Sequence, residues 1–313
     1  MHRNPALIEL GFSPQDRVVI IHADDLGMCH AANAAFADLV SFGLVTCGSA
    51  MVPCPWFPEL AAYGRQHPEA DIGVHLTLNS EHPSYRWPPI STRDPASGLL
   101  DEEGYLPRTV RALHGQVSPE AALAEIRAQV VRALAAGIDV THVDTHMAAV
   151  IHPQVFSGYL NLAMERRLPG LFPRLTPELA QRLALPTHTT AVFGEELDRL
   201  EAMGLPLIDH VASVSLGPAE DPLGAYQRAC EALQPGLTHL IIHPALPGSE
   251  IEAIIRDAWQ RIADYQAMMS QELRSHLAAA GVHVLGYREL RDVMRTAMGQ
   301  PPGPGTSDGL SAT

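Results

Sequence analysis

The sequence predicts an α/β protein, a single-domain TIM-like (β/α) barrel that is either complete or incomplete and distorted. Short apolar, β-branched runs alternate with helical patterns along most of the 313 residues, which is typical of a parallel sheet. This length fits one such barrel with insertions. No G-x-G-x-x-G pattern follows the first strand, so an open dinucleotide-binding sheet is the poorer interpretation.

We expect seven strands, with helices between them. The predicted strands cover 17–22, 44–52, 72–78, 138–144, 207–214, 237–243 and 282–286. The predicted helices lie near 30–42, 56–66, 118–136, 153–167, 194–203, 222–233 and 250–280. The third of these helices has the clearest ends, because Ser118 suits an N-cap, Pro119 the first turn and Gly137 a left-handed C-terminal cap.

Two segments interrupt the alternation. Residues 79–116 are rich in proline and contain Tyr85, Trp87 and Tyr105. A connection of that length is usually a lid or binding loop, or else disordered, and we expect it to shape the substrate pocket. Residues 299–313 have no aromatic side chain and little to bury, so we expect a disordered tail and a barrel domain over 1–298.

The charge balance limits the partners of the chain. Its 35 acidic and 21 basic residues give a formal net charge of -14, and no basic run interrupts the sequence. This composition lacks the positive patch that nucleic acid or an anionic membrane requires. The N-terminus has no apolar core of a signal peptide, and no apolar run reaches the roughly 18 residues of a membrane span. We therefore expect a cytoplasmic protein with neither kind of partner.

Lysine is absent from the chain, because all 21 basic residues are arginine. Schiff-base catalysis, a P-loop lysine and a carbamylated lysine bridging two metals are therefore excluded. The 16 histidines, in contrast, make metal binding and proton transfer available. The cysteines show no C-x-x-C spacing, so we expect them to be reduced and mostly buried; they are Cys29, Cys47, Cys54 and Cys230.

Polar side chains stand at the ends of four predicted strands. Asp24 and Asp25 follow the first strand, His75 lies in the third, His146 follows the fourth and His243 ends a late one. Taken singly, each has an ordinary interpretation, such as a helix cap, a core histidine or a turn. Because parallel strands of a barrel end at one face, the residues converge, and together they predict a metal-dependent active site. Two imidazoles and one carboxylate suit zinc or another first-row divalent ion with a position left for water, and a second carboxylate can serve as a general base.

At these residues the sequence resembles the YdjC-like (ChbG/HpnK) carbohydrate deacetylases. The matching pieces lie within residues 17–295, in the order of the family; they are IIHADDLGMCHAANAAF, DIGVHLTLN, THVDTHMAAVIHPQVF, LIIHPA, and RIADYQAMMSQEL with GVHVLGYREL. The resemblance implies a TIM-like barrel, one divalent metal ion (zinc or magnesium, with cobalt or manganese as alternatives), and removal of acetyl groups from N-acetylated sugars. It also implies a homo-oligomer.

The resemblance assigns roles by position. Asp25, His75 and His146 are expected to bind the metal, Asp24 to act as the base that takes the proton of the water, and His243 to protonate the departing amine. Four further residues are expected to support the ligands or contact the substrate; they are His142, Asp144, Asn79 and Trp87. Among these, Asp144 is expected to hold His142 or His146 in the correct tautomer. Trp87 either stacks on a sugar or anchors its loop to the core.

One departure from the family pattern leaves the particular sugar open. Ala148 and Val150 stand where the family commonly has further histidines, and His152 follows instead. The same three ligands would equally serve a metal-dependent hydrolase of another amide or ester. A non-catalytic sugar-binding barrel is the third alternative, although binding alone does not need the second carboxylate of Asp24.

Overall fold

The computed structural model describes residues 3–183, 185–217 and 221–299. In these residues seven parallel strands are hydrogen-bonded in the order β4-β3-β2-β1-β6-β5, and β7 pairs with the first half of β1. The strands are β1 (Arg17–Leu26), β2 (Cys47–Ala50), β3 (Asp71–Leu76), β4 (Val143–Thr145), β5 (His210–Ser213), β6 (Gly236–Ile242) and β7 (Val282–Val284). All of the predicted strands are therefore present, most of them shorter than expected.

An irregular segment joins the two edges of this sheet. Gly170 forms a parallel bridge to Val143 of β4, and Pro173 forms one to Ile208, just before β5. Backbone hydrogen bonds accompany both bridges, including one of 2.9 Å from Arg174 N to the Ile208 carbonyl. The sheet thus curls into a barrel in which the segment between β4 and β5 is not a regular strand. This arrangement confirms the predicted fold class in its incomplete and distorted form.

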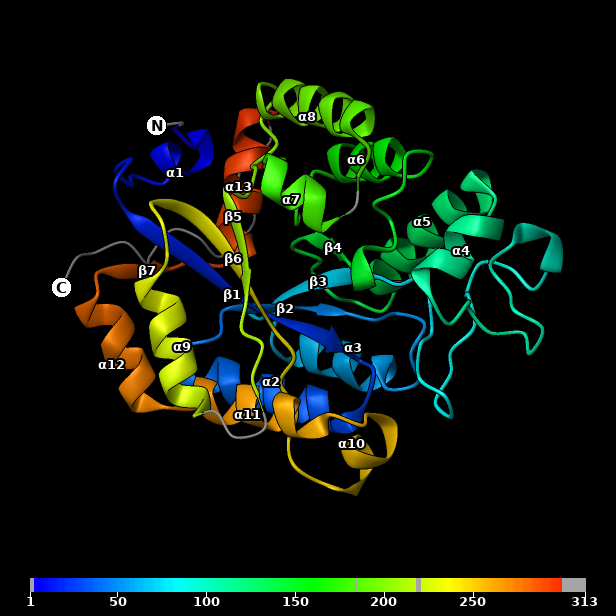
Figure 1. Ribbon diagram of the computed structural model, residues 1–313, viewed down its shortest axis with the longest axis horizontal. Helices are drawn as coiled ribbons and strands as arrows, with labels where there is room; N and C mark the ends of the chain where they lie inside the picture. Colours follow the sequence, from blue (N-terminus) through cyan, green and yellow to red (C-terminus); the bar gives the residue numbers. More distant parts are fainter. Residues whose placement is uncertain (1–2, 184, 218–220, 300–313) are drawn as a thin grey trace.

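Helices surround the sheet (Figure 1). In that view α2 and α3 lie below it, α4 and α5 at the right, α6, α7, α8 and α13 above it, and α9, α11 and α12 at the lower left. The helices are α1 (Pro5–Glu9), α2 (His30–Phe42), α3 (Phe57–Gln66), α4 (Val110–Gln116), α5 (Pro119–Ala135), α6 (Phe156–Arg166), α7 (Pro177–Arg182), α8 (Thr187–Glu201), α9 (Pro222–Glu231), α10 (Ser249–Ile254), α11 (Ala258–Met268), α12 (Gln271–Ala279) and α13 (Tyr287–Ala297). Two 3-10 turns, η1 (Pro95–Ser97) and η2 (His146–Ala148), complete the elements.

The helix ends show where the sequence predictions succeed and fail. For α5, the Ser118 side chain accepts from Ala121 N at 3.3 Å, and Gly137 adopts a φ of 88°, both as predicted. The single helix expected over 250–280 is wrong, because this stretch forms α10, α11 and α12. Ile255 has an extended backbone after α10, and Ser270 caps the start of α12. The prediction also missed α1, α4, α7 and α13.

Side chains of β1 alternate between the barrel interior and the helices. Val18 and Ile20 belong to an interior cluster that α1 and α13 help to close, whereas Val19 and Ile21 pack in the larger cluster under the helices. Because successive strand residues point to opposite faces, the interior series of β1 continues from Ile20 to His22. The interior is therefore apolar at the amino ends of the strands and polar farther along them.

The loop of residues 79–116 is not a loose lid. Trp87, Leu99, Leu106 and Leu113 within it are fully buried in the main core cluster. The segment also contains η1 and α4. The four cysteines are buried and unpaired, as predicted. Apart from Gly299, the expected disordered tail lies outside the described residues.

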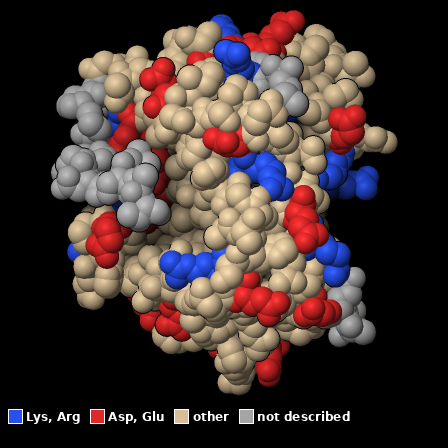
Figure 2. All heavy atoms as spheres, turned by 90° about the vertical axis from the view of Figure 1, so that its left-hand side faces the viewer, with Lys and Arg blue, Asp and Glu red and all other residues tan. Residues whose placement is uncertain are grey.

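Figure 2 shows the face at the left of Figure 1, where arginine side chains are interspersed among acidic ones. None of the helices in the described part of the chain has the length and apolar character needed to cross a membrane. The expectations about nucleic acid and cellular location stay predictions.

Candidate metal centre and active site

A bulge at the end of β1 brings two neighbouring carboxylates to the same place. The pairing of β1 with β2 shifts register between Ala23 and Leu26, and Asp25 adopts a φ of 62°. Aspartate is one of the few residues that tolerate this left-handed conformation, and backbone strain of this kind clusters at functional sites. In a regular strand Asp24 and Asp25 would point to opposite faces. The bulge lets both side chains reach the carboxyl-terminal end of the barrel.

The structure brings the three predicted metal ligands together. Asp25 Oδ1 lies 3.1 Å from His146 Nδ1 and 3.4 Å from His75 Nε2, and the two ring nitrogens are 3.3 Å apart. All three side chains are buried. Asp25 Oδ1 accepts no hydrogen bond of good geometry, although it has almost no contact with solvent. A buried oxygen in this state needs a partner, and a cation between these three atoms would supply it.

Charge supports the same conclusion. Four carboxylates, of Asp24, Asp25, Glu81 and Asp144, lie beside the two imidazoles, and the Arg261 guanidinium pairs with that of Asp25. Two further groups of residues lie close enough to hold a cation, but in each of them one carboxylate oxygen of an aspartate is already engaged. Asp24 Oδ1 is bonded to an imidazole, and Asp144 Oδ2 to another. The Asp25 group therefore fits a divalent ion best among the described residues.

Neighbouring side chains orient the two imidazoles. His75 Nδ1 lies 2.8 Å from Asp144 Oδ2, which also accepts from Ser49 Oγ at 3.0 Å. The prediction that Asp144 holds His142 or His146 is wrong. Asp144 is the register partner of His75 in the β3–β4 pairing, so the two side chains stand side by side. Their contact turns His75 Nε2 toward Asp25.

Glu81 plays the corresponding part for His146. Its carboxylate oxygens lie 3.0 and 3.2 Å from His146 Nε2, which leaves Nδ1 to face Asp25. On the other side of Asp25, Arg261 donates to Oδ2 at 2.6 Å. Each candidate ligand is thus held by a second charged or polar group.

Burial and neighbouring charges set the pKa values of this cluster. Burial alone would raise the pKa of Asp25, but the Arg261 guanidinium and the neighbouring imidazoles of His146 and His75 together hold that pKa well below its usual range. Burial alone would lower the pKa of both imidazoles. For His75 the charges of Asp144 and Asp24 reverse this effect, and for His146 Glu81 and Asp25 raise the pKa to about 9. The cluster therefore demands positive charge, which protons or a divalent cation can provide.

Asp24 has one engaged and one available oxygen. Its Oδ1 lies 2.6 Å from His22 Nδ1, whereas its Oδ2 lies 3.9 Å from both His75 Nε2 and His243 Nε2. Burial would raise the pKa of Asp24, but the His75 charge and the His22 hydrogen bond lower it on balance. Asp24 is therefore ionised at neutral pH and has a free oxygen between two imidazoles.

His243 connects this cluster with solvent. Its side chain is 42% exposed and lines a cavity of about 320 Å³. Its backbone N–H donates to Asp264 Oδ2 at 2.9 Å, which fixes the chain at the end of β6. The walls of the cavity also include Arg261, Ser213 and Ser215. The cavity is thus polar, and it touches the predicted proton donor.

The predicted supporting residues occupy different places. His142 lies deeper in the barrel, where its ring nitrogen faces His22 and not the three ligands. Asn79 is buried and donates to Glu81 Oε2 at 3.2 Å. Trp87 is fully buried, and its indole N–H donates to the Asn79 carbonyl at 2.9 Å. Trp87 therefore anchors its loop, and in this structure it offers no ring face to a sugar.

The segment after His146 has an unusual backbone. Met147 and Ala148 both adopt left-handed φ values, of 50° and 56°. Met147 is 52% exposed beside the site, and Val150 is fully buried. A histidine in place of Val150 would consequently be buried as well.

Sequence reasoning missed Glu81 and Arg261. Glu81 follows β3 by only a few residues but lies in a segment whose pattern indicates a loop. Arg261 lies on α11, in the RIADY piece that carries part of the resemblance without an assigned role. A buried aspartate needs a positively charged partner, so an arginine is expected near Asp25, but the sequence does not show which arginine it is.

Comparison with known proteins gives the family. A model of the family described as YdjC-like protein matches residues 18–279. The chain belongs to the YdjC-like family. It is 37% identical over 279 residues to the carbohydrate deacetylase of Thermus thermophilus, with 89% of this chain and 95% of that protein covered. It is 33% identical over 272 residues to the carbohydrate deacetylase of Brevibacillus brevis, covering 87% of this chain and 99% of the other.

A solved structure supports the fold of this YdjC-like chain. It is the crystal structure of an Enterococcus faecalis V583 protein described as a proposed cellobiose-phosphate cleavage protein. The TM-score is 0.72 at 21% identity, with 88% of this chain and 99% of the other covered. The resemblance drawn from the sequence motifs is thus confirmed at the level of family and fold.

Proposed function

We propose that this YdjC-like chain is a metal-dependent carbohydrate N-deacetylase that removes the acetyl group from an N-acetylated amino sugar or short oligosaccharide. Its relatives named carbohydrate deacetylase match it over almost their whole length. The observation that carries the proposal is the buried Asp25 Oδ1, which lacks a hydrogen bond and faces two imidazole nitrogens. Asp24 and His243 stand next to it with an available oxygen and an exposed ring.

The residues of the chain have distinct tasks in this proposal. Asp25, His75 and His146 hold one divalent ion, zinc or magnesium, with cobalt or manganese as alternatives. When bound, such an ion polarises the acetyl carbonyl and makes water more acidic. Asp24 takes the proton of the attacking water at Oδ2. His243, on the wall of the cavity, gives a proton to the amine nitrogen as the amide bond breaks.

A substrate and metal screen tests the proposal. The purified chain is stripped of metal, then supplied separately with Zn²⁺, Mg²⁺, Co²⁺ or Mn²⁺ and offered N-acetylated monosaccharides and short oligosaccharides. We expect equal amounts of acetate and free amine from at least one sugar, and none from the stripped protein. An N-acetylated amino acid and an acetyl ester of a sugar serve as controls for general amide or ester hydrolysis. Turnover of these controls alone would contradict the proposal.

A further inference from the structure

A chain of buried polar side chains runs from Asp24 into the barrel. Asp24 Oδ1 lies 2.6 Å from His22 Nδ1, and His22 Nε2 lies 2.7 Å from His142 Nε2. His142 Nδ1 is 2.8 Å from Thr141 Oγ1, which in turn bonds Asp71. His22, His142 and Thr141 are all fully buried. These contacts continue the interior side of β1 below the site described above.

The fold prepares space for both rings. An added Cβ on Gly73 would lie 2.4 Å from His142 Nε2, so only glycine at this position admits the ring. The Tyr287 ring stacks on His142 with centroids 4.1 Å apart. The His239 ring lies 4.7 Å from that of His22. Packing therefore fixes the orientation of the imidazole pair.

Hydrogen-bond chemistry sets the direction of the contact with Asp24. An ionised Asp24 can only accept, so His22 Nδ1 must carry the hydrogen between them. The two Nε2 atoms of His22 and His142 face each other at 2.7 Å, and one hydrogen between them joins the two rings. The contact with His142 thereby holds the His22 ring with Nδ1 toward Asp24.

We propose that His22 and His142 are positioning residues for Asp24. The pair occupies Oδ1 of Asp24 and leaves Oδ2 as the one oxygen that faces the cluster, 3.9 Å from His75 and from His243. The inference rests on the proposed function, in which Asp24 takes a proton. Neither histidine touches the reacting atoms.

A second cation site is the competing interpretation. His22, Asp24 and His239 lie close enough together to hold a cation. However, both ring nitrogens of His22 are already engaged, at 2.6 and 2.7 Å. A cation bound there would have to break one of these contacts.

Substitutions at His22 test the inference by kinetics. His22→Leu should lower kcat about 10–100-fold, with KM and the content of one metal ion per chain unchanged. His22→Asn should recover most of kcat, because its amide N–H can replace Nδ1–H. The matched control is His210→Asn at the start of β5, whose ring nitrogen bonds the Pro235 carbonyl at 3.1 Å and takes no part in these contacts; it should keep near-wild-type kcat.

The double variant separates positioning from general damage. In an Asp24→Asn background, His22→Leu should cause no further loss of kcat, because its target is already gone. An equal loss in both backgrounds, or His22→Leu with wild-type kcat, would overturn the inference while leaving the deacetylase proposal standing. Two metal ions per chain in the wild type, falling to one in His22→Leu, would also overturn it.

A spectroscopic measurement does not depend on activity. In ¹⁵N-histidine spectra of the full chain with its metal, His22 Nδ1 should carry a hydrogen that is bonded to Asp24, and His142→Leu should weaken that hydrogen bond. A wild-type His22 without a hydrogen on Nδ1 would overturn the inference even if no acetylated sugar were turned over.

Discussion

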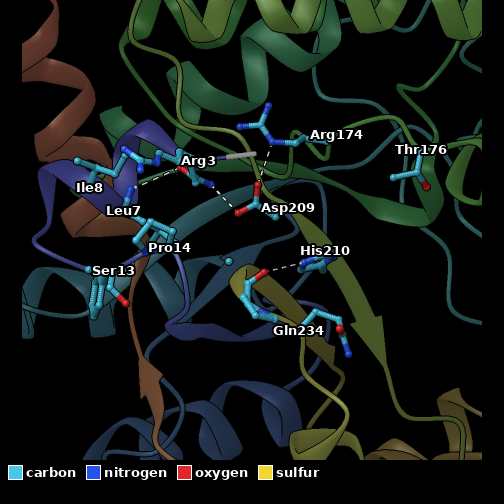
Figure 3. Close-up of a pocket in the computed structure, with 14 residues that line it drawn as sticks. Arg3, Leu7, Ile8, Ser13, Pro14, Arg174, Thr176, Asp209, His210 and Gln234 are labelled. Atoms are coloured by element: carbon cyan, nitrogen blue, oxygen red, sulfur yellow. Dashed lines mark hydrogen bonds and ion pairs between the residues drawn. The ribbon is translucent and has the colours of Figure 1, made fainter. Parts of the chain in front are cut away.

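Two aspartates at opposite ends of the barrel are each paired with an arginine. At the amino-terminal end, Asp209 Oδ1 accepts from Arg174 Nε at 2.9 Å (Figure 3). Its Oδ2 accepts from Asn4 Nδ2 at 2.9 Å and from Leu237 N at 2.8 Å. Every oxygen of this carboxylate has a donor. Asp209 thereby ties α1, β6 and the segment after Gly170 together.

At the other end of the barrel, only one of the two carboxylate oxygens of Asp25 has a hydrogen-bond donor. Arg261 occupies Oδ2, whereas Oδ1 faces two imidazoles without a hydrogen bond and the backbone is strained. The cavity beside Asp209 measures about 370 Å³ and that beside His243 about 320 Å³, so size does not distinguish the two ends. What distinguishes them is whether the buried polar atoms are satisfied. A carboxylate whose oxygens all have hydrogen-bond donors stabilises the fold, whereas one with an oxygen that lacks a donor is available to a ligand.

Of the substitutions that test this comparison, one at Asp25 should have the largest effect. Asp25→Asn keeps the size of the side chain but replaces a charged ligand by a neutral amide. We expect loss of the metal ion together with loss of detectable deacetylation, because both depend on this oxygen. Metal analysis beside initial rates checks this expectation. A variant that keeps one ion and turns over normally would show that the Asp25 cluster is not the site.

Asp24→Asn should separate metal binding from chemistry. The amide cannot take a proton at neutral pH, so kcat should fall about 10²–10⁴-fold. The metal content should stay at the wild-type level, because the Asp25 cluster is intact. A metal-free variant, or one with near-wild-type kcat, would mean that the roles of the two neighbouring aspartates are assigned wrongly.

Much of the fold was predictable because its signals are local. Apolar runs at strand length and the cap at Ser118 depend on a few neighbouring residues. The irregular segment that joins β4 to β5 was not predictable, because its bridges link Gly170 and Pro173 to residues far along the chain. The division of 250–280 depended on two extended residues, Ile255 after α10 and Ser270 before α12, within an otherwise continuous helical pattern.

The candidate site likewise has one part that the sequence predicts and another that it does not. Parallel topology alone places Asp25, His75 and His146 at one end, and the structure brings them together as expected. The partner of Asp144 depends on the β3–β4 register, which the hydrophobic pattern does not specify for two polar residues. The positions of Glu81 and Trp87 depend on how the long loop of residues 79–116 folds back onto the barrel, and the chemistry of the side chains does not determine the path of that loop.

Glu81→Gln should have a smaller effect on the metal site than the substitutions at Asp25 and Asp24. The amide keeps one contact to His146 but removes the charge that holds its ring, so metal affinity should fall about 10–100-fold. A titration of the stripped protein with metal measures this. Glu103→Gln is the matched control in the same loop, because Glu103 is exposed and pairs with Arg86 and Arg108 instead. Equal affinities for the two variants would remove Glu81 from the site.

Asp209→Asn tests the other side of the comparison and should have the smallest effect on activity. The amide nitrogen turns one acceptor into a donor, so one donor among Arg174, Asn4 and Leu237 is left without a partner. Stranding a buried group costs about 1–3 kcal/mol, and we expect the free energy of unfolding to fall by this amount. Metal content and kcat should stay at wild-type values, because Asp209 touches none of the ligands. Denaturant unfolding beside kinetics measures both quantities. If kcat or metal content fell as in Asp25→Asn, the two ends of the barrel would be coupled. The number of hydrogen-bond donors to a buried carboxylate would then no longer separate a structural aspartate from a functional one.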